Sequence, residues 1–291
     1  MSEYINNVTW RKEIIKSVLR QLHEGKSVEE VQAEFGRLAQ EVGSSEIAEI
    51  EQILMEEGLP AEEIQSLCDV HVAVFRAGLD QQRPSETIPG HPIYTFRAEN
   101  QVAARMLAEM KRTIEQAIAE NSMMTILTFG MQAEKLAEID RHYLRKENLL
   151  FPYLEQYGFQ GPSKVMWGIH DTIRAKVRNL INLSQKGLVG IDQTKTSFDE
   201  LATDIQEMVY KEEKILYPAS LEHLKEGDWA AIRAQESEFG YFFVVPGNEW
   251  QPVTTADLHA QPGRIAYEPA ENTTAGELPL HTGMLTLKQI D

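Results

Sequence analysis

Side chains of the types that bind metal ions recur in four long amphipathic segments of this sequence. They are His91 and Glu99 in the first segment, His142 and Glu147 in the second, His170 in the third, and Glu212 with Glu213 in the fourth. Imidazole and carboxylate without thiolate suit iron, manganese or zinc. Bridging carboxylates let two such ions share one bundle interior. The residue types therefore predict a centre of one or two metal ions, and redox iron there would bind dioxygen, nitric oxide or peroxide at an open position.

A purely structural role for the same residues stays open at this point. A lone histidine on an apolar helix face is usually a hydrogen-bonded core residue. Most charged pairs on helices are solvated neighbours, so Glu147 has Lys146 as an alternative partner and Glu213 has Lys214. The metal interpretation depends on all four segments contributing together.

A near-repeat links the second and fourth segments. RKENLLFPYLE at 145–155 and YKEEKILYPASLE at 210–222 share the order of charged residues, apolar residues and proline. Such internal similarity indicates two-fold pseudo-symmetry, which is common in bundles that hold paired metal sites.

The four segments have the lengths of bundle helices. Apolar residues recur at helical spacing near 91–121, 123–157, 162–187 and 194–222. Each has about 25–35 residues, or roughly 40–50 Å at 1.5 Å per residue. The breaks contain Asn121-Ser122, Gly158 to Pro162, and Gly187 to Asp192. We therefore expect an all-α fold built on an up-down-up-down four-helix bundle.

The flanking regions have a different character. Residues 1–80 predict a small domain of short helices that end at glycines, and Ser27 with Glu30 forms a capping box at the start of the second. Residues 81–90 read as a polar linker before the bundle at 91–224. The remainder, 225–291, predicts a short helix around Asp228–Ser237, a strand-like YFFVVPG and an irregular, extended tail.

Composition excludes several classes of protein. There are 28 Lys and Arg against 45 Asp and Glu, a formal net charge of −17, which repels phosphate backbones and favours cations as partners. No apolar run approaches the roughly 20 residues that span a bilayer, and the N-terminus lacks the apolar core of a signal peptide. We therefore expect a cytoplasmic protein that binds neither nucleic acid nor membranes.

The single cysteine, Cys68, excludes an internal disulfide and any Cys-rich zinc or iron–sulfur site. Cys68 and His71 share a helical face with apolar neighbours, so packing is the simpler interpretation. A redox-sensitive thiol or an additional metal or haem ligand is the alternative.

The motifs resemble those of the hemerythrin-like HHE cation-binding family over about residues 88–224. His91, HYLRKENLLFP, IHDTIR and MVYKEEKILYP match its four helices in order. The resemblance implies a non-haem iron bundle, often di-iron, that senses or carries oxygen-type ligands. It implies five metal ligands: His91, His142, Glu147, His170 and Glu212. Residues 8–80 resemble the domain of unknown function 438, which commonly precedes such a bundle, and HTGMLTLKQID resembles the approach to a PAS domain.

Two positions depart from the family pattern. Lys146 stands where the second helix usually carries a carboxylate ligand, and Met208 stands where the fourth helix usually carries a histidine. Either Glu147 replaces the missing carboxylate, or the Lys146 ammonium neutralises carboxylates in place of one ion. The second alternative leaves a mononuclear or an empty site.

Three functions follow from these observations. The first is a sensor of oxygen, nitric oxide, redox or metal state that signals to a C-terminal partner such as a PAS-like domain. The second is a di-iron enzyme that acts on peroxide or nitric oxide or repairs iron–sulfur clusters. The third is a metal-free helical interaction module. We assign no turnover, because no nucleophile–base pair or phosphate-binding loop is evident, and the amphipathic helices also permit a homodimer.

Overall fold

The computed structural model describes most of the chain. The described residues are 2–31, 33, 44–60, 63–64, 70, 74–75, 88–252, 277–280 and 283–286. Cys68, His71 and most of the predicted linker lie outside the described residues, as do most residues of the tail after Pro252.

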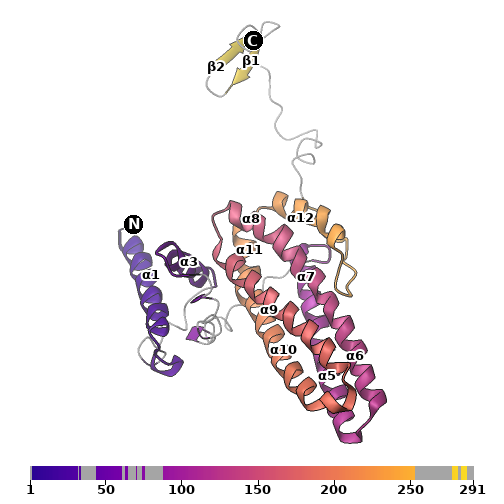
Figure 1. Cartoon of the computed structure of the whole chain (residues 1–291). Coiled ribbons are helices and arrows are strands. Elements are labelled where there is room, and N and C mark those ends of the chain that lie inside the picture. The colour runs from indigo at the N-terminus through magenta and orange to yellow at the C-terminus, as the bar shows by residue number, and fades with distance from the viewer. Residues whose placement is uncertain are drawn as a thin grey trace. The chain divides into compact units, whose positions relative to one another are not determined.

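Four long helical rods form the bundle that the sequence predicts (Figure 1). The first is α5 (Pro92–Glu120), and the third is α9 (Gly161–Ser184). The second comprises α6 (Met123–Leu136), η1 (Ala137–Ile139), α7 (Asp140–Arg145), η2 (Lys146–Leu150) and α8 (Phe151–Gln156). The fourth comprises α10 (Ile191–Lys211), η4 (Glu212–Leu216) and α11 (Tyr217–His223). None of the described helices is both long and apolar enough to cross a membrane.

Local sequence signals mark where these rods begin and end. Asn121 ends α5 in the left-handed conformation with φ 46°, and the Ser122 hydroxyl then caps α6 by accepting from the Thr125 N–H. Gly158 follows α8 with φ 80°, and the short 3₁₀ turn η3 (Gly187–Gly190) joins α9 to α10. The predicted breaks between the four segments are therefore confirmed.

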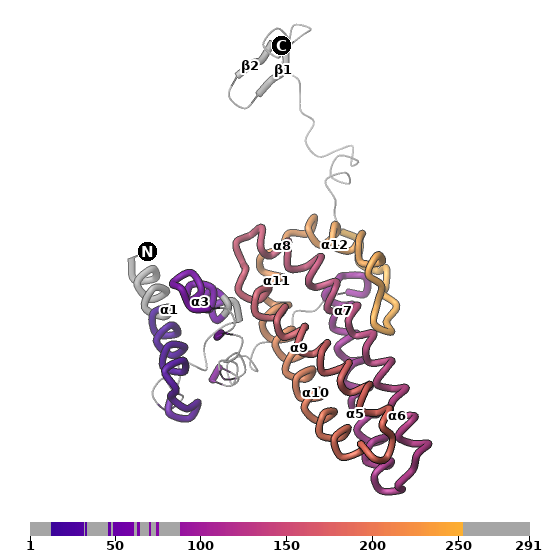
Figure 2. Tube along the Cα trace, in the orientation of Figure 1, coloured from indigo at the N-terminus to yellow at the C-terminus, as the bar shows by residue number. Residues whose placement is uncertain are grey.

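Neighbouring rods pack in the order α5, α6, α9, α10 and back to α5. Figure 2 shows them side by side along the bundle. Their inward faces are apolar and buried, and edge-to-face contact between Phe129 of α6 and Phe198 of α10, with ring centroids 5.5 Å apart, crosses the centre. The hydrophobic effect on these faces holds the rods together.

A π-helical turn interrupts the second and fourth rods at equivalent places. In η2 the Phe151 N–H bonds to the Lys146 carbonyl, and in η4 the Tyr217 N–H bonds to the Glu212 carbonyl. Pro152 and Pro218 follow directly; each lacks an N–H, and its ring crowds the carbonyl four residues earlier, which favours a wider turn. The near-repeat of the sequence is thus a structural repeat, and η2 starts where the consecutive residues Arg145, Lys146 and Glu147 are all buried.

The N-terminal part contains α1 (Ser2–His23) and α3 (Ser44–Glu56), which pack against each other. The predicted capping box is present, since the Ser27 N–H donates to Glu30 and the Glu30 N–H donates to the Ser27 hydroxyl. The Gln52 side chain of α3 donates to the Gly158 carbonyl and accepts from the Gln160 N–H, at 2.7 and 3.1 Å.

The helix α12 (Glu226–Phe239) and the segment 240–250 lie over one end of the bundle; we call residues 240–250 the strap. The strap is not the strand expected from YFFVVPG, because Phe242 is buried in the bundle and Phe243 has φ 52°, which no extended strand accommodates. Its far end bonds to the start of the bundle through the Trp250 N–H and the Pro89 carbonyl, at 2.8 Å.

The residues after Pro252 form a separate unit. Its described residues are two short antiparallel strands, β1 (Glu277–Leu280) and β2 (Gly283–Thr286), paired from Glu277 with Thr286 to Leu280 with Gly283. The described part of the tail therefore contains one antiparallel pair of short strands.

Replacing Phe129 with alanine tests the bundle core. We expect F129A to lower the free energy of unfolding by about 3–5 kcal/mol, because it removes buried ring contacts and leaves a cavity. Urea denaturation measures the loss. Met124→Ala on the same helix is the control: Met124 is 74% exposed, so a change within about 0.5 kcal/mol is expected. Equal losses in the two variants would contradict the packing described.

Candidate metal centre

Four side chains from three rods meet inside the bundle next to the π turns. They are His142 of α7, Lys146 of η2, His170 of α9 and Glu212 of η4, and none is more than 2% exposed. The His142 Nε2 lies 3.2 and 3.3 Å from the two Glu212 carboxylate oxygens. The His170 Nε2 lies 3.0 Å from the Lys146 Nζ, and Lys146 also donates to Glu212. We call these four residues the central cluster.

Each histidine is oriented by a carboxylate on its other ring nitrogen. The His142 Nδ1 lies 2.8 Å from Glu99 of α5, and the His170 Nδ1 lies 2.7 Å from Glu147. A ring that donates from Nδ1 presents Nε2 to the central cluster as a lone pair or as a second donor. Metal-binding histidines are commonly held in this way by a carboxylate behind them. Glu99 and Glu147 therefore lie behind the rings rather than between them.

The Lys146 ammonium occupies the middle of the central cluster. It donates to Glu212, faces the His170 Nε2, and lies 4.7 Å from the centroid of the Tyr143 ring. The Tyr143 ring in turn stacks on His170 at 4.3 Å with an angle of 11°. This arrangement matches the alternative in which Lys146 neutralises a carboxylate.

Each carboxylate next to the central cluster has a basic partner. Lys146 pairs with Glu212, Arg145 with Glu99, and Arg174 with Glu147. Arg174 also pairs with Asp140 and Asp171, and Arg145 lies 3.7 Å from the buried Glu236. Burial without such pairing would be costly.

The pKa values follow from burial and these pairs. Burial raises the pKa of Glu212, but the charges of Lys146 and His142 outweigh it, so the pKa lies well below the usual range. Burial lowers the pKa of His170 strongly, and the Lys146 charge adds to the effect. Burial also lowers the pKa of Lys146, against the attraction of Glu212. His170 is therefore a neutral ring whose Nε2 accepts from Lys146.

His91 lies apart from the central cluster. Its Nδ1 accepts from the Ile93 N–H at the start of α5, and its ring lies 4.8 Å from both Trp229 and Trp250. Glu99, which does reach His142, is eight residues further along α5, or about 12 Å. Burial, with the charge of Arg97, lowers the pKa of His91 to about 4. The structure thus brings together four of the five predicted ligands, with Glu147 behind His170. His91 lies instead next to Trp250, at the end of the strap.

Glu213 and Met208 are the two other residues that the sequence analysis considered near the site. Glu213 points to the other side of η4, where it accepts from Arg97 and Asn100 at 3.0 and 3.2 Å. Met208, at the position where a histidine is expected, is fully buried and offers only a thioether. Neither adds a nitrogen or oxygen donor to the central cluster.

The strap is bonded directly to the residues behind His142. The Phe242 N–H donates to Glu99 at 2.6 Å, and Arg145 donates to the Gly240 carbonyl at 2.8 Å. Arg145 is itself fully buried between the rings of Phe96 and Tyr241, at 4.8 and 4.7 Å. Glu99 therefore accepts from both the central cluster and the strap.

The buried role of Arg145 and the orienting role of Glu99 were not predicted from the sequence. The only signal was RKE, three consecutive charged residues within the apolar helix HYLRKENLLFP. In a regular helix three consecutive side chains spread around most of the circumference. The π turn, together with the strap that covers Arg145, explains why all three are buried.

The donor types suit a metal ion. In the described part of the chain, no group of three or more His, Cys, Asp or Glu side chains is arranged to hold a metal ion as it stands. The His170 Nε2 and the Glu212 carboxylate nevertheless contact Lys146, and the His142 Nε2 contacts the same carboxylate. A cation that took the place of Lys146 would therefore meet His170 and Glu212, with His142 next to Glu212.

Two models of known protein families match this chain at the positions of the motifs. Residues 91–220 match the family model described as hemerythrin HHE cation binding domain. Residues 15–81 match the model described as a family of unknown function, DUF438. No curated protein matches the chain. The family resemblance seen in the sequence is therefore confirmed for both parts.

Replacing Glu99 with glutamine tests the buried charge pairing. We expect E99Q to lower the free energy of unfolding by about 3–5 kcal/mol, because Arg145 keeps its buried charge and loses the carboxylate to which it donates. Glu138→Gln is the control, since Glu138 pairs with Arg141 on the surface and such pairs contribute at most about 1 kcal/mol. If urea denaturation gives similar values for both, the network does not carry the stability assigned to it.

Glu236 of α12 is a buried carboxyl group whose pKa makes the stability of the protein depend on pH. Burial raises its pKa to about 7, although Arg145 and Arg233 favour the ionised form. The folded protein therefore binds one proton more than the unfolded chain between about pH 4.5 and 7, and stability falls as pH rises through this window. We expect Glu236→Gln to flatten this fall and to be more stable than the wild type at pH 8, by on the order of 3 kcal/mol. Urea denaturation from pH 5 to 8 measures it, and parallel pH curves for the two proteins would refute it.

Proposed function

Residues 91–220 belong to the hemerythrin HHE cation-binding domain family, and on that premise we propose that the domain is a metal-responsive sensor module. In this proposal it binds a single iron ion through His142, His170 and Glu212, in competition with the Lys146 ammonium. The observation that carries the proposal is the position of Lys146, which is a cation held by Glu212 and His170 next to His142.

The orientation of the two histidines supports a cation site. Glu99 and Glu147 hold the Nδ1 atoms, so both Nε2 atoms face the central cluster. The His142 Nε2 faces both oxygens of a carboxylate, an arrangement that is stable only with a proton or another cation between them. These contacts pre-orient the donors and lower the cost of ordering them on binding.

Two features favour one ion over two. Lys146 and Met208 stand where the family usually has two further ligands, and the carboxylates Glu99 and Glu147 already pair with Arg145 and Arg174. His91 and Glu147, also predicted from the sequence as ligands, are left out of the proposed set because other partners hold them. Bound iron would supply an open coordination position for a small ligand such as dioxygen or nitric oxide.

The residues of the chain provide a route from the site to the C-terminal side. Glu99 contacts the His142 Nδ1 with one oxygen and the Phe242 N–H with the other. A change in the hydrogen bonding of His142 alters how strongly Glu99 accepts from the Phe242 N–H. Phe242 is part of the strap, and the strap leads on to the tail. We infer that the strap passes the state of the site to a partner beyond it.

A second function, a metal-free interaction module, is favoured by one observation. Each of the three buried carboxylates already has a basic partner from the chain itself. In this reading Lys146 is a permanent structural cation.

Metal content decides between the two functions. Protein purified without chelators is loaded with Fe(II) under anaerobic conditions, desalted and measured by elemental analysis. We expect up to about one iron per chain in the wild type, loss in Glu212→Gln, and tighter retention in Lys146→Glu, which replaces the competing ammonium with a carboxylate donor. Parallel loading with Mn(II) and Zn(II) tests the choice of metal.

Glu213→Gln is the matched control, because Glu213 is the next residue but faces Arg97 and Asn100. It should retain as much iron as the wild type. Circular dichroism checks that each variant is folded. Folded wild type and K146E that both lack metal would overturn the sensor proposal and leave the interaction module.

A further inference from the structure

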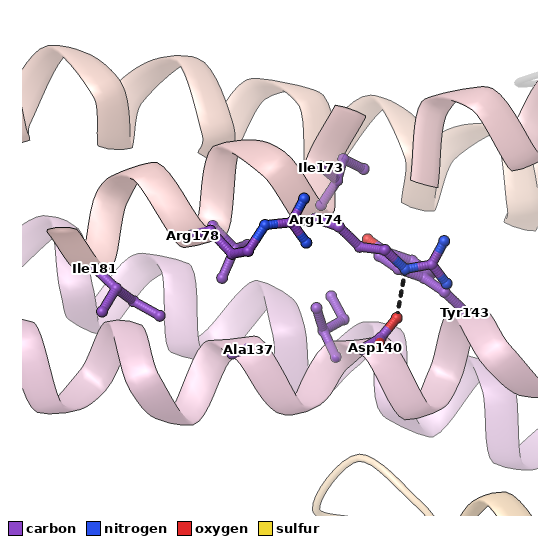
Figure 3. A pocket seen from close by; sticks show the side chains of 9 residues that line it. Ala137, Asp140, Tyr143, Ile173, Arg174, Arg178 and Ile181 are labelled. Carbon is purple, nitrogen blue, oxygen red and sulfur yellow. Dashed lines mark hydrogen bonds and ion pairs between the residues drawn. The ribbon is translucent and has the colours of Figure 1, made fainter. Parts of the chain in front are cut away.

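A groove lies between η1–α7 and α9, and Tyr143 and Arg174 are among the residues that line it (Figure 3). Its volume is about 210 Å³. Its walls are mostly apolar, formed by Ala137, Ile139, Ile173, Val177 and Ile181. The proposed metal function uses none of these residues.

The Tyr143 hydroxyl is an unpaired polar group at the bottom of this groove. Tyr143 is 1% exposed, and its hydroxyl has no hydrogen-bond partner among the described residues. Figure 3 shows the ring reaching past Arg174 into the groove. Buried polar groups are almost always paired, so an isolated one beside a cavity indicates a ligand or a bound water.

Two arginines of α9 border the groove in different ways. Arg174 is fully engaged, at 2.6 Å to Asp140, 2.9 Å to Asp171 and 2.8 Å to Glu147, and closes one end. Arg178 is exposed, and within the described part of the chain it has no ion-pair partner. In Figure 3 its guanidinium points along the groove toward Arg174 and Tyr143. An anion that accepts from Tyr143 would therefore also meet a free guanidinium.

We propose that this groove binds a small organic carboxylate with an apolar body about the size of one ring. The Tyr143 hydroxyl and the Arg178 guanidinium hold the carboxylate, and the apolar walls hold the body. An engineered cavity of about 150 Å³ accommodates benzene, so the volume here suffices for one ring. The apolar walls disfavour phosphate, whose remaining oxygens would lose water without gaining partners.

The site is separate from the proposed metal centre, although the two share a wall. The Tyr143 ring stacks on His170, and the same residue lines the groove. Binding in the groove needs no metal, so it is measured on chelator-treated protein. Its failure therefore leaves the metal proposal untouched, and the reverse also holds.

Isothermal titration of the full chain with sodium benzoate at constant ionic strength tests the proposal. We expect saturable binding at one site per chain, and weaker binding of the neutral analogue benzamide. Tyr143→Phe and Arg178→Gln should each raise the benzoate Kd about tenfold, as loss of one charge-assisted hydrogen bond does. Arg112→Gln, which removes an exposed arginine of α5, should leave the Kd unchanged.

Two results would overturn the proposal. One is the absence of saturable binding for both benzoate and hexanoate, which would leave bound water as the partner of Tyr143. The other is binding that Y143F and R178Q do not weaken relative to R112Q. Thermal unfolding of Y143F checks its fold. If Y143F is destabilised, the test rests on R178Q alone, because Arg178 lies at the surface and its replacement does not disturb the core.

Discussion

The burial of three carboxylates, each next to a basic side chain, is the constraint on which the interior of this bundle depends. Each buried carboxylate loses its water and has to recover that free energy from a cation at close range. Arg145 with Glu99, Lys146 with Glu212 and Arg174 with Glu147 meet this requirement from different rods. The pairs therefore fix the relative positions of α5, α7, α9 and η4 more narrowly than apolar packing alone would.

The same pairs make the centre of the bundle a site with a resident cation. Lys146 holds donors that suit a metal ion, and the carboxylates behind His142 and His170 hold the rings in place. Exchange of one cation for another would change the hydrogen bonds of few residues. One of those residues, Glu99, also accepts from the backbone of Phe242. The strap is thus the part of the fold most directly connected to the state of the centre.

Much of the fold follows from local signals, and the errors have physical causes. Periodicity gave 162–187 for a helix that spans Gly161–Ser184, and Ser27 with Glu30 gave a capping box that is present. YFFVVPG has the composition of a strand, yet Phe242 is buried in the bundle and its N–H bonds to Glu99 instead of to a neighbouring strand. Arg145 was overlooked because its partners, Glu99 and the Gly240 carbonyl, lie 46 and 95 residues away.

By itself the sequence determined the helical class, the four rods, the proline-linked repeat and the residue types that a cation site needs, because these depend on periodicity and on the chemistry of single side chains. Only the tertiary structure decided which of those residues meet. His91 and Glu99 lie on the same helix, but about 12 Å of helix rise separates them, and only Glu99 reaches His142. The tertiary structure also decided that Lys146 lies between Glu212 and His170, since that contact requires three rods in register.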